Sequence, residues 1–187
     1  LVDAAHAKGL MVFLDVVYNH FGPEGNYLNA YASAFFTDRH KTPWGDAINV
    51  DGPRNANVRD YFIHNTLYWI EEFHMDGLRF DAVHAILDDS DKLFLQELAE
   101  RVHDMVRGKR HVHLVLENDE NEAHLLERHP EGDPRWHTAQ WNDDLHHSLH
   151  AAASGEASGY YADYAGDAVK LARALAEGFA FQGHASS

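Results

Sequence analysis

The residues best suited to chemistry lie in one short segment, 76–84, which reads Asp-Gly-Leu-Arg-Phe-Asp-Ala-Val-His. Its apolar residues alternate with Arg79 and Asp81, so these two charged side chains share one face of an expected strand. A buried arginine beside a buried aspartate at a strand end is costly unless the pair is well satisfied or used. We interpret Asp81 as the candidate catalytic carboxylate. A purely structural Arg79–Asp81 ion pair is the alternative.

A second carboxylate, Glu117, ends the apolar segment 111–117. Neighbouring parallel strands lie about 4.8 Å apart, so carboxyl groups that end adjacent strands can lie about 5 Å apart. That separation is typical of a retaining glycosidase, whereas an inverting enzyme needs about 6.5–9.5 Å. Arg79 is expected to keep Asp81 ionised, while Glu117 has no adjacent cation in the sequence, which favours a raised pKa and a proton to donate. Capping of the next helix is the alternative role for Glu117.

The elements that must position these carboxylates alternate along the chain. Four apolar segments predict strands, at residues 10–17, 77–81, 111–117 and 138–142. Helical spacing and capping residues predict a helix end at residues 1–8 and helices at 58–74, 90–108, 120–128, 145–153 and 165–179, with Asn57 and Ser90 as N-caps. Strict alternation implies parallel strands joined by right-handed crossovers.

Two α/β architectures fit that alternation, an open doubly wound sheet and a (β/α)8 TIM barrel. The sequence lacks the glycine-rich phosphate turns typical of the open sheet. Its strands instead end in acidic or amide residues, which is typical of a TIM barrel: Asp15, Asp81, Glu117 and Asn142. Four strands cannot close a barrel that needs about eight strands and roughly 250 residues. We therefore expect residues 1–187 to form a partial catalytic barrel domain, roughly strands three to six, within a longer protein.

The composition excludes several classes of partner. The formal net charge of −15 argues against nucleic acid and anionic membranes, both of which need a basic surface. No run of 18 apolar residues is present, which argues against a membrane span. The chain has no cysteine, so disulfides and thiolate metal sites are excluded and a cytoplasmic location is expected.

A long loop is expected at residues 21–56, after the first strand. Loops of this length inside a compact domain are usually functional. The segment is rich in aromatic residues, among them Tyr27, Tyr31 and Trp44, which could stack on sugar rings. For Phe35 and Phe36 we favour packing into a small core of the loop itself.

Three segments together resemble the α-amylase superfamily of glycoside hydrolases: Asp15-Val16-Val17-Tyr18-Asn19-His20, Gly77 to His84, and Leu116-Glu117-Asn118. They follow one another in the order typical of that family, on successive predicted strands. The resemblance implies that Asp81 is the nucleophile, that Glu117 is the general acid/base, and that Arg79 orients the nucleophile. It further implies that Asp15 supports Arg79, that His20 contacts the sugar in the cleaved subsite, and that His84 lies on the leaving-group side.

Within the superfamily, residues 15–28, 42–49, 141–147 and 159–164 are similar to the trehalose-releasing branch, the maltooligosyltrehalose trehalohydrolases. This resemblance implies hydrolysis of the α-1,4 bond next to a terminal trehalose, in maltooligosyltrehalose or a related α-glucan. It adds Tyr18, Asp144 and Tyr161 as expected substrate contacts. A glycogen branching enzyme with the same nucleophile, and a non-catalytic binding module derived from the barrel, are the alternatives.

The sequence departs from the family pattern in one respect. The fourth signature, an Asn-His-Asp that supplies a third carboxylate, is not found up to Ser187. We therefore expect these 187 residues to be inactive by themselves. Members of the family often bind calcium through the asparagine that corresponds to Asn19, but the trehalose-releasing branch does not look calcium-dependent. We predict no metal and no cofactor.

Overall fold

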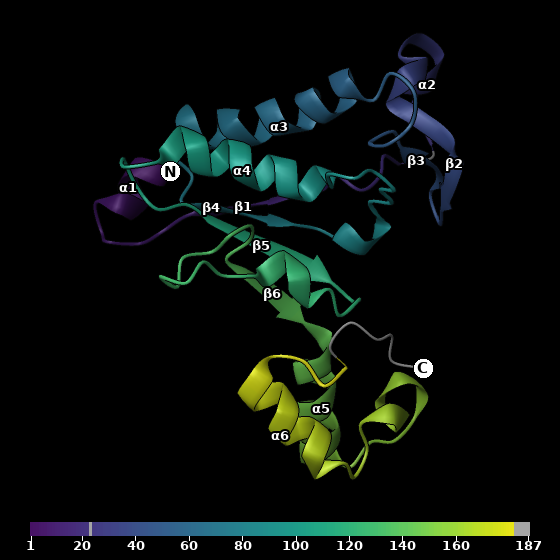
Figure 1. Ribbon diagram of the computed structural model, residues 1–187, viewed down its shortest axis with the longest axis vertical. Helices are drawn as coiled ribbons and strands as arrows, with labels where there is room; N and C mark the ends of the chain where they lie inside the picture. The colour runs from purple at the N-terminus through teal and green to yellow at the C-terminus, as the bar shows by residue number, and fades with distance from the viewer. Residues whose placement is uncertain (23, 182–187) are drawn as a thin grey trace.

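The computed structural model describes residues 1–22 and 24–181. A four-stranded parallel sheet with the order β1-β4-β5-β6 forms its centre (Figure 1). Its strands are β1 (Phe13–Val16), β4 (Gly77–Phe80), β5 (His113–Asn118) and β6 (Ala139–Asn142). All four predicted strands are present and parallel, so the predicted α/β fold is confirmed. The first is shorter than the expected segment 10–17, because its register with β4 runs only from Phe13 to Val16.

One face of the sheet is covered by two helices, α3 (Ala56–Glu71) and α4 (Phe94–Val106) (Figure 1). The strands present alternate apolar residues to this layer, which lie side by side in the register Leu14–Leu78–Leu114 and Val16–Phe80–Leu116. Phe62 and Ile63 of α3 and Leu98 of α4 are buried against them. Burial of side chains of this size stabilises the fold by about 1.5–3 kcal/mol each. This layer holds the strand ends in place.

The other face of the sheet carries larger and more polar side chains. Gly77 is required at its centre, because a Cβ there would lie 2.5 Å from Cε1 of Phe13 and 2.6 Å from the carbonyl oxygen of His113. The bare backbone of β4 lets the rings of Phe13 and His113 meet above it, with centroids 5.6 Å apart. Arg79, Glu117 and Trp141 lie on this same face, toward the carboxyl ends of the strands.

The segment 21–56 is not the plain loop that we expected. It contains helix α2 (Leu28–Tyr31), a 3-10 turn η1 (Ser33–Phe35), and an antiparallel hairpin of β2 (Phe36–Thr42) and β3 (Gly45–Ile48). The strand β2 is rich in charged residues, so its alternation is hidden from a search for apolar patterns. Phe35 and Phe36 pack with Phe21, as predicted, but the three rings join the main hydrophobic core and do not form a separate core of the segment, because Phe35 also packs on Phe62 of α3.

Both predicted N-caps are wrong. Helix α3 starts at Ala56 after Asn55, which places Asn57 inside the helix. Helix α4 starts only at Phe94, because Asp88 accepts the Phe94 backbone N–H at 2.5 Å and takes the capping role expected of Ser90. Ser90 instead donates its own N–H to Asp88 at 3.0 Å.

The remaining elements connect the strands or follow the sheet. Helix α1 (Val2–His6) precedes β1, the 3-10 turn η2 (Val83–Ala85) follows β4, and a short 3-10 helix η3 (Ala123–Leu126) replaces the helix predicted at 120–128. After β6 come α5 (Asp143–Ser154), η4 (Gly159–Asp163) and α6 (Ala168–Glu177). Helices α5 and α6 pack on each other beyond the end of β6 and share a small second core (Figure 1). The predicted helices at 145–153 and 165–179 are thereby confirmed.

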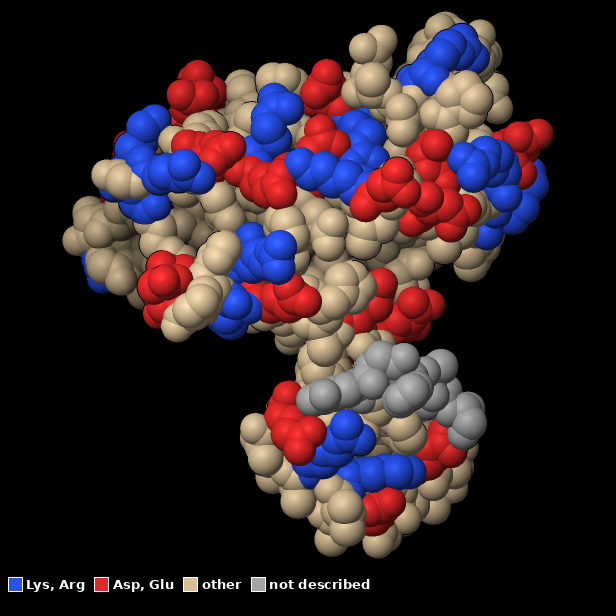
Figure 2. Space-filling model, viewed as in Figure 1, with Lys and Arg blue, Asp and Glu red and all other residues tan. Residues whose placement is uncertain are grey.

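The surface matches an acidic protein with mixed charges. On the face seen in Figure 2, lysine and arginine side chains alternate with aspartate and glutamate, and no continuous basic area is visible. Among the residues that the structure describes, every helix is too short or too polar to cross a bilayer.

Candidate active site

One guanidinium group, that of Arg79, binds three carboxylates at the carboxyl ends of the strands. Its Nη1 lies 2.7 Å from Oδ1 of Asp15 and 3.1 Å from Oδ1 of Asp81, and its Nη2 lies 2.8 Å from Oε2 of Glu117. Two of the partners follow from the local strand geometry. Asp15 pairs with Arg79 across β1 and β4, and Asp81 comes directly after β4, two residues from Arg79 and on the same face. Glu117 lies two residues beyond Val115, the register partner of Arg79 on β5. The structure therefore brings together the four residues that the sequence analysis placed at the centre of the site.

Asp81 lies in a setting that favours its ionised form. Burial raises the pKa of this carboxyl group, but hydrogen bonds from Asn19, Glu117 and Arg79 outweigh the burial, and the pKa is lowered. Asn19 donates from Nδ2 to Oδ2 of Asp81 at 3.1 Å. An ionised, partly exposed carboxylate at a strand end is the state that a nucleophile needs.

Glu117 has a neighbour that the sequence did not reveal. No cation is adjacent to Glu117 in the sequence, but Nη2 of Arg79 reaches it from the neighbouring strand β4, at 2.8 Å from Oε2. Its Oε2 also accepts the backbone N–H of Ala82 at 2.9 Å. The hydrogen-bonding contact between Glu117 and Asp81 places the two carboxyl groups close together. Such closeness favours the short separation of a retaining pair over the wide separation of an inverting pair.

The turn that follows Asp81 has a strained backbone. Ala82 adopts the left-handed conformation, with φ 40° and ψ 54°. A residue with a Cβ rarely adopts this region, and when it does the surrounding contacts must hold it there. In this conformation Ala82 directs its N–H to Glu117, so that the turn after Asp81 also fixes the second carboxylate.

His20 lies next to Asn19 and is covered by an aromatic ring from the hairpin. Its imidazole stacks on Trp44, with ring centroids 4.0 Å apart and an interplanar angle of 13°, and its Nδ1 contacts Oδ1 of Asn19. Both rings line a depression of about 210 Å³ on the hairpin side. His20 is thus connected to Asp81 through a single intervening residue.

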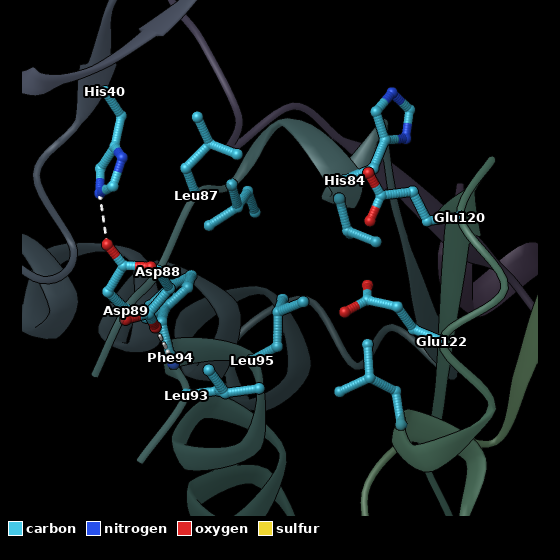
Figure 3. Close-up of a pocket in the computed structure, with 13 residues that line it drawn as sticks. His40, His84, Leu87, Asp88, Asp89, Leu93, Phe94, Leu95, Glu120 and Glu122 are labelled. Atoms are coloured by element: carbon cyan, nitrogen blue, oxygen red, sulfur yellow. Dashed lines mark hydrogen bonds and ion pairs between the residues drawn. The ribbon is translucent and has the colours of Figure 1, made fainter. Parts of the chain in front are cut away.

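His84, in the turn η2 after Asp81, borders a second pocket. The pocket has a volume of about 270 Å³ (Figure 3). In Figure 3, His84, Glu120 and Glu122 form one wall and His40 and Asp89 lie opposite, while Leu93 and Leu95 lie below and Leu87 lies above, between the two walls. The imidazole of His84 is held by Asp119, with Nδ1 3.0 Å from Oδ1. Apolar surface below convergent polar groups is typical of a site for a small polar ligand.

The structure buries two of the predicted substrate contacts, Tyr18 and Asp144, and their role in binding stays a prediction. Tyr18 packs in the core, donates its hydroxyl to Oδ1 of Asn65 at 2.7 Å, and has a pKa raised by burial to about 12. Asp144 is also buried, and accepts from the Tyr164 hydroxyl at 2.5 Å and from the Phe181 N–H at 2.8 Å. Both residues stabilise the fold around the site.

Tyr161 lies in the turn η4, beside α5 and away from the contacts around Arg79. It stacks on His150 with ring centroids 4.2 Å apart. The structure does not bring this ring to the carboxylates, and its role as a substrate contact stays a prediction.

Sequence reasoning missed two residues of the site. Trp141 of β6 covers Arg79, with the guanidinium carbon 4.3 Å from the ring centroid, and it pairs in register with Glu117. Asn19 directs its amide into the turn after Asp81. Register alone would have placed Trp141 on the catalytic face, once β5 and β6 were known to be neighbours.

The groups that could hold a cation do not include the catalytic candidates Asp81 and Glu117. Among the described residues, ligand atoms converge in two sets, Asp143 with His146 and His147, and His40 with Asp51 and Asp89. The polar atoms of Asn19, the residue connected with calcium by resemblance, contact Asp81, Ala82 and His20. The absence of a metal from this protein stays a prediction.

Comparison with known proteins shows extended similarity to one group of enzymes. No protein-family model matches the chain. The malto-oligosyltrehalose trehalohydrolase of Saccharolobus solfataricus is 44% identical over 173 residues, covering 91% of this chain and 29% of that protein. Those of Arthrobacter ramosus and Deinococcus radiodurans are 47% and 42% identical over 88% and 98% of this chain, each with 28% of the relative covered. This chain therefore spans about 30% of the length of these relatives.

Solved structures agree with the fold. The 1.4 Å crystal structure of a Salmonella typhimurium protein that bears an alpha amylase name matches with a TM-score of 0.88 and 48% identity, over 99% of this chain and 31% of that one. The α-amylase of Geobacillus thermoleovorans, solved with acarbose, matches with a TM-score of 0.52 and 22% identity over 66% of this chain and 29% of that one, which supports the fold alone. The parallel sheet is thus part of a (β/α)8 barrel of the α-amylase type.

Proposed function

Because this chain is a relative of the malto-oligosyltrehalose trehalohydrolases of the α-amylase superfamily, we propose that it forms the central part of a retaining glycosidase. The enzyme would cleave the α-1,4-glucosidic bond next to the terminal trehalose of maltooligosyltrehalose and release trehalose. The observation that carries this proposal is the binding of Asp81 and Glu117 by the two terminal nitrogens of Arg79. One cation thereby holds a nucleophile and an acid/base at adjacent strand ends.

In the first step, a carboxylate oxygen of Asp81 attacks the anomeric carbon of the bond to be cleaved. Glu117 donates its proton to the glycosidic oxygen, the carbon–oxygen bond breaks, and trehalose leaves while the glucan stays as an ester on Asp81. Arg79 and Ala82 both bind Oε2 of Glu117, so we assign the transferred proton to Oε1.

In the second step, a water molecule replaces the departed trehalose. Glu117, now ionised, takes a proton from this water, whose oxygen attacks the same anomeric carbon and releases Asp81. Two inversions give overall retention of configuration. Every atom comes from substrate, water or the two carboxyl groups, so none of these steps needs a cofactor.

The sugar rings would bind on both sides of Asp81. We propose that His20 contacts the glucose unit that becomes attached to Asp81. Trp44 would hold the His20 imidazole in place by stacking on it. The pocket beside His84 would lie on the side of the leaving trehalose, where carboxylates and imidazoles can pair with sugar hydroxyls. Because the substrate is uncharged, the acidic character of the chain does not oppose binding. Without cysteine, the protein is suited to the reducing cytoplasm, where we place it.

A branching transferase would use the same carboxylates. The branching enzyme GlgB of Jannaschia is 42% identical over 46% of this chain, whereas the trehalohydrolases match over 88% or more. This wider similarity favours hydrolysis. We also propose that residues 1–187 are one part of a catalytic barrel domain, because they correspond to about 30% of each relative.

The decisive experiment supplies the full-length protein with maltooligosyltrehalose and measures free trehalose by chromatography. Asp81→Asn is expected to abolish turnover and largely retain substrate binding. The matched control is Asp60→Asn. Asp60 is an exposed aspartate on α3, and its described contact is an ion pair with Arg101, with Oδ1 3.8 Å from Nη1. New α-1,6 branches on amylose without release of trehalose would identify a transferase, and turnover by Asp81→Asn would refute the nucleophile.

A further inference from the structure

Asn19, which follows the end of β1, makes three contacts to the turn after β4 through its side-chain amide. Its side chain is buried, with 1% of the residue exposed. Its Nδ2 lies 2.6 Å from the carbonyl oxygen of Asp81, 3.1 Å from Oδ2 of Asp81, and 3.3 Å from the carbonyl oxygen of Ala82. A single amide thus binds both the backbone and the side chain of the candidate nucleophile.

The carbonyl groups that Asn19 binds belong to the strained turn. Ala82 is left-handed, and its N–H donates to Glu117 at 2.9 Å. A strained residue keeps its conformation only where its surroundings hold it. Asn19 donates to the carbonyl oxygen of the same peptide, which is that of Asp81, and to the carbonyl oxygen of the next peptide, which is that of Ala82. The position of Glu117 therefore depends on the same amide as the position of Asp81.

We propose that Asn19 is a positioning residue for the hydrolytic reaction, which fixes the left-handed turn Asp81–Ala82 and so holds Asp81 and Glu117 in one mutual arrangement. This inference rests on the proposed roles of those two carboxylates. It assigns to Asn19 a function that acts through the protein backbone and requires no bound cation. Asn19 acts through Asp81 and Ala82, whose oxygen atoms it binds.

The charged groups around Asp81 set the background for a test by pH. Arg79 of β4 binds Asp81 directly, and Glu117 of β5 lies beside it. Asp15 of β1 binds the same guanidinium group, and His20 contacts the other side of the Asn19 amide. The hydrogen bond from Asn19 is among the contacts that lower the pKa of Asp81. Without Nδ2 the pKa of Asp81 rises, so the acidic limb of kcat/KM moves to higher pH. A purely structural asparagine would leave that limb in place.

Asn49 provides a matched control. It is equally buried, donates from Nδ2 to the carbonyl oxygens of Ala34 at 2.9 Å and Pro53 at 3.0 Å, and accepts the Gly52 N–H at 2.9 Å. It belongs to the segment after β3 and contacts none of the residues bound to Arg79. Asn49→Ala therefore removes a comparable set of buried hydrogen bonds without altering the catalytic turn.

The experiment compares Asn19→Ala, Asn19→Asp and Asn49→Ala in the full-length protein, by thermal melting and by kinetics on maltooligosyltrehalose over a range of pH. For Asn19→Ala we expect kcat to fall about 10- to 100-fold with KM changed less than about threefold, as for a misplaced catalytic group. Asn19→Asp, which keeps the shape but places a like charge beside Asp81, should move the acidic limb further. Asn49→Ala should lower the melting temperature and leave the acidic limb unchanged.

The inference is overturned if the Asn19 variants keep the wild-type acidic limb, or lose activity only in proportion to stability as Asn49→Ala does. If Asn19→Ala does not fold, the acidic limb of the isosteric Asn19→Asp decides. Failure of the proposed function would look different, because the wild type would then release no trehalose or Asp81→Asn would still turn over.

Discussion

Arg79 and Trp141 form a cation–π pair across β4 and β6, with the guanidinium carbon 4.3 Å from the centre of the indole ring. The two residues are 62 positions apart in sequence, and β5 lies between their strands. Trp141 is 58% exposed, so the ring is not needed to fill the core. We interpret it as a cover that keeps the guanidinium flat against the three carboxylates.

Replacement of Trp141 by leucine should therefore affect catalysis more than stability. A cation–π contact at a partly exposed site contributes about 0.5–1 kcal/mol, so the melting temperature should change little. Freed from the ring, Arg79 would hold its carboxylates less firmly, and we expect kcat to fall about tenfold. Steady-state kinetics and thermal melting measure the two effects.

The matched control for this change is Trp136→Leu. Trp136 also lies beneath an arginine, with the Arg135 carbon 5.1 Å from its ring, but it packs against the helical side of the core. The expected pattern is reversed, with stability lost and kcat retained. Equal kinetic losses in the two variants would contradict a specific role for Trp141.

Gly77 permits the close contact of β1 and β5 side chains, and Gly77→Ala tests this packing. A Cβ would meet the Phe13 ring at 2.5 Å and the backbone oxygen of His113 at 2.6 Å, and the backbone oxygen cannot move aside as a ring can. We expect a loss of about 1–3 kcal/mol in the free energy of unfolding, measured by denaturant titration. Gly22→Ala, at a position with open space and an ordinary backbone, is the control and should be nearly neutral. Wild-type stability of Gly77→Ala would mean that the sheet can widen at this point.

His84 should control binding on the leaving-group side. Its imidazole borders the pocket of Figure 3 and is fixed by Asp119. His84→Ala should raise KM for maltooligosyltrehalose about tenfold with a smaller change in kcat, as for a contact that binds substrate and transition state alike. The exposed His64 on α3 provides the control variant His64→Ala. A fall in kcat at constant KM would instead place His84 in the chemical step.

The sequence predicted the parts of the site that depend on local geometry. Asp81 and Arg79 are two residues apart, so strand periodicity alone places them on one face, and the structure agrees. Glu117 was foreseen as a strand-end carboxylate, but its ion pair with Arg79 was not, since it depends on the alignment of β4 with β5. Register between distant strands is set by packing over the whole sheet and leaves no mark in a short segment.

Other differences between sequence and structure have similar physical causes. Tyr18 and Asp144 lie in segments rich in candidate site residues, yet each side chain points into the protein and its polar group is hydrogen-bonded there. Side-chain direction at a strand end depends on the residues packed around it. The hairpin of β2 and β3 was missed because its charged side chains make ion pairs, such as those of His40 and Lys41, in place of an apolar pattern.

Asp76 lies at the opposite end of β4 from Asp81, and a change in its charge should alter stability without altering catalysis. Its Oδ2 accepts the Val12 N–H at 2.7 Å and contacts Nε2 of His6 at 2.8 Å, and Arg110 lies 3.9 Å away. Burial raises the pKa of Asp76, but these hydrogen bonds and charges outweigh the burial and lower it. The folded state therefore favours the ionised form more than the unfolded state does.

The sign of the pH effect follows from that shift. A carboxyl group with a lowered pKa in the folded state contributes its full stability above the unfolded value of about 3.9, and loses it as the pH falls through the folded value. Asp76→Asn should thus be less stable than wild type by about 1–2 kcal/mol at pH 7. The difference should shrink below about pH 4 and vanish at lower pH, while kcat at pH 7 stays unchanged. Denaturant titrations of both proteins from pH 2 to pH 7 measure this difference, and a gap that is independent of pH would assign the loss to packing and not to charge.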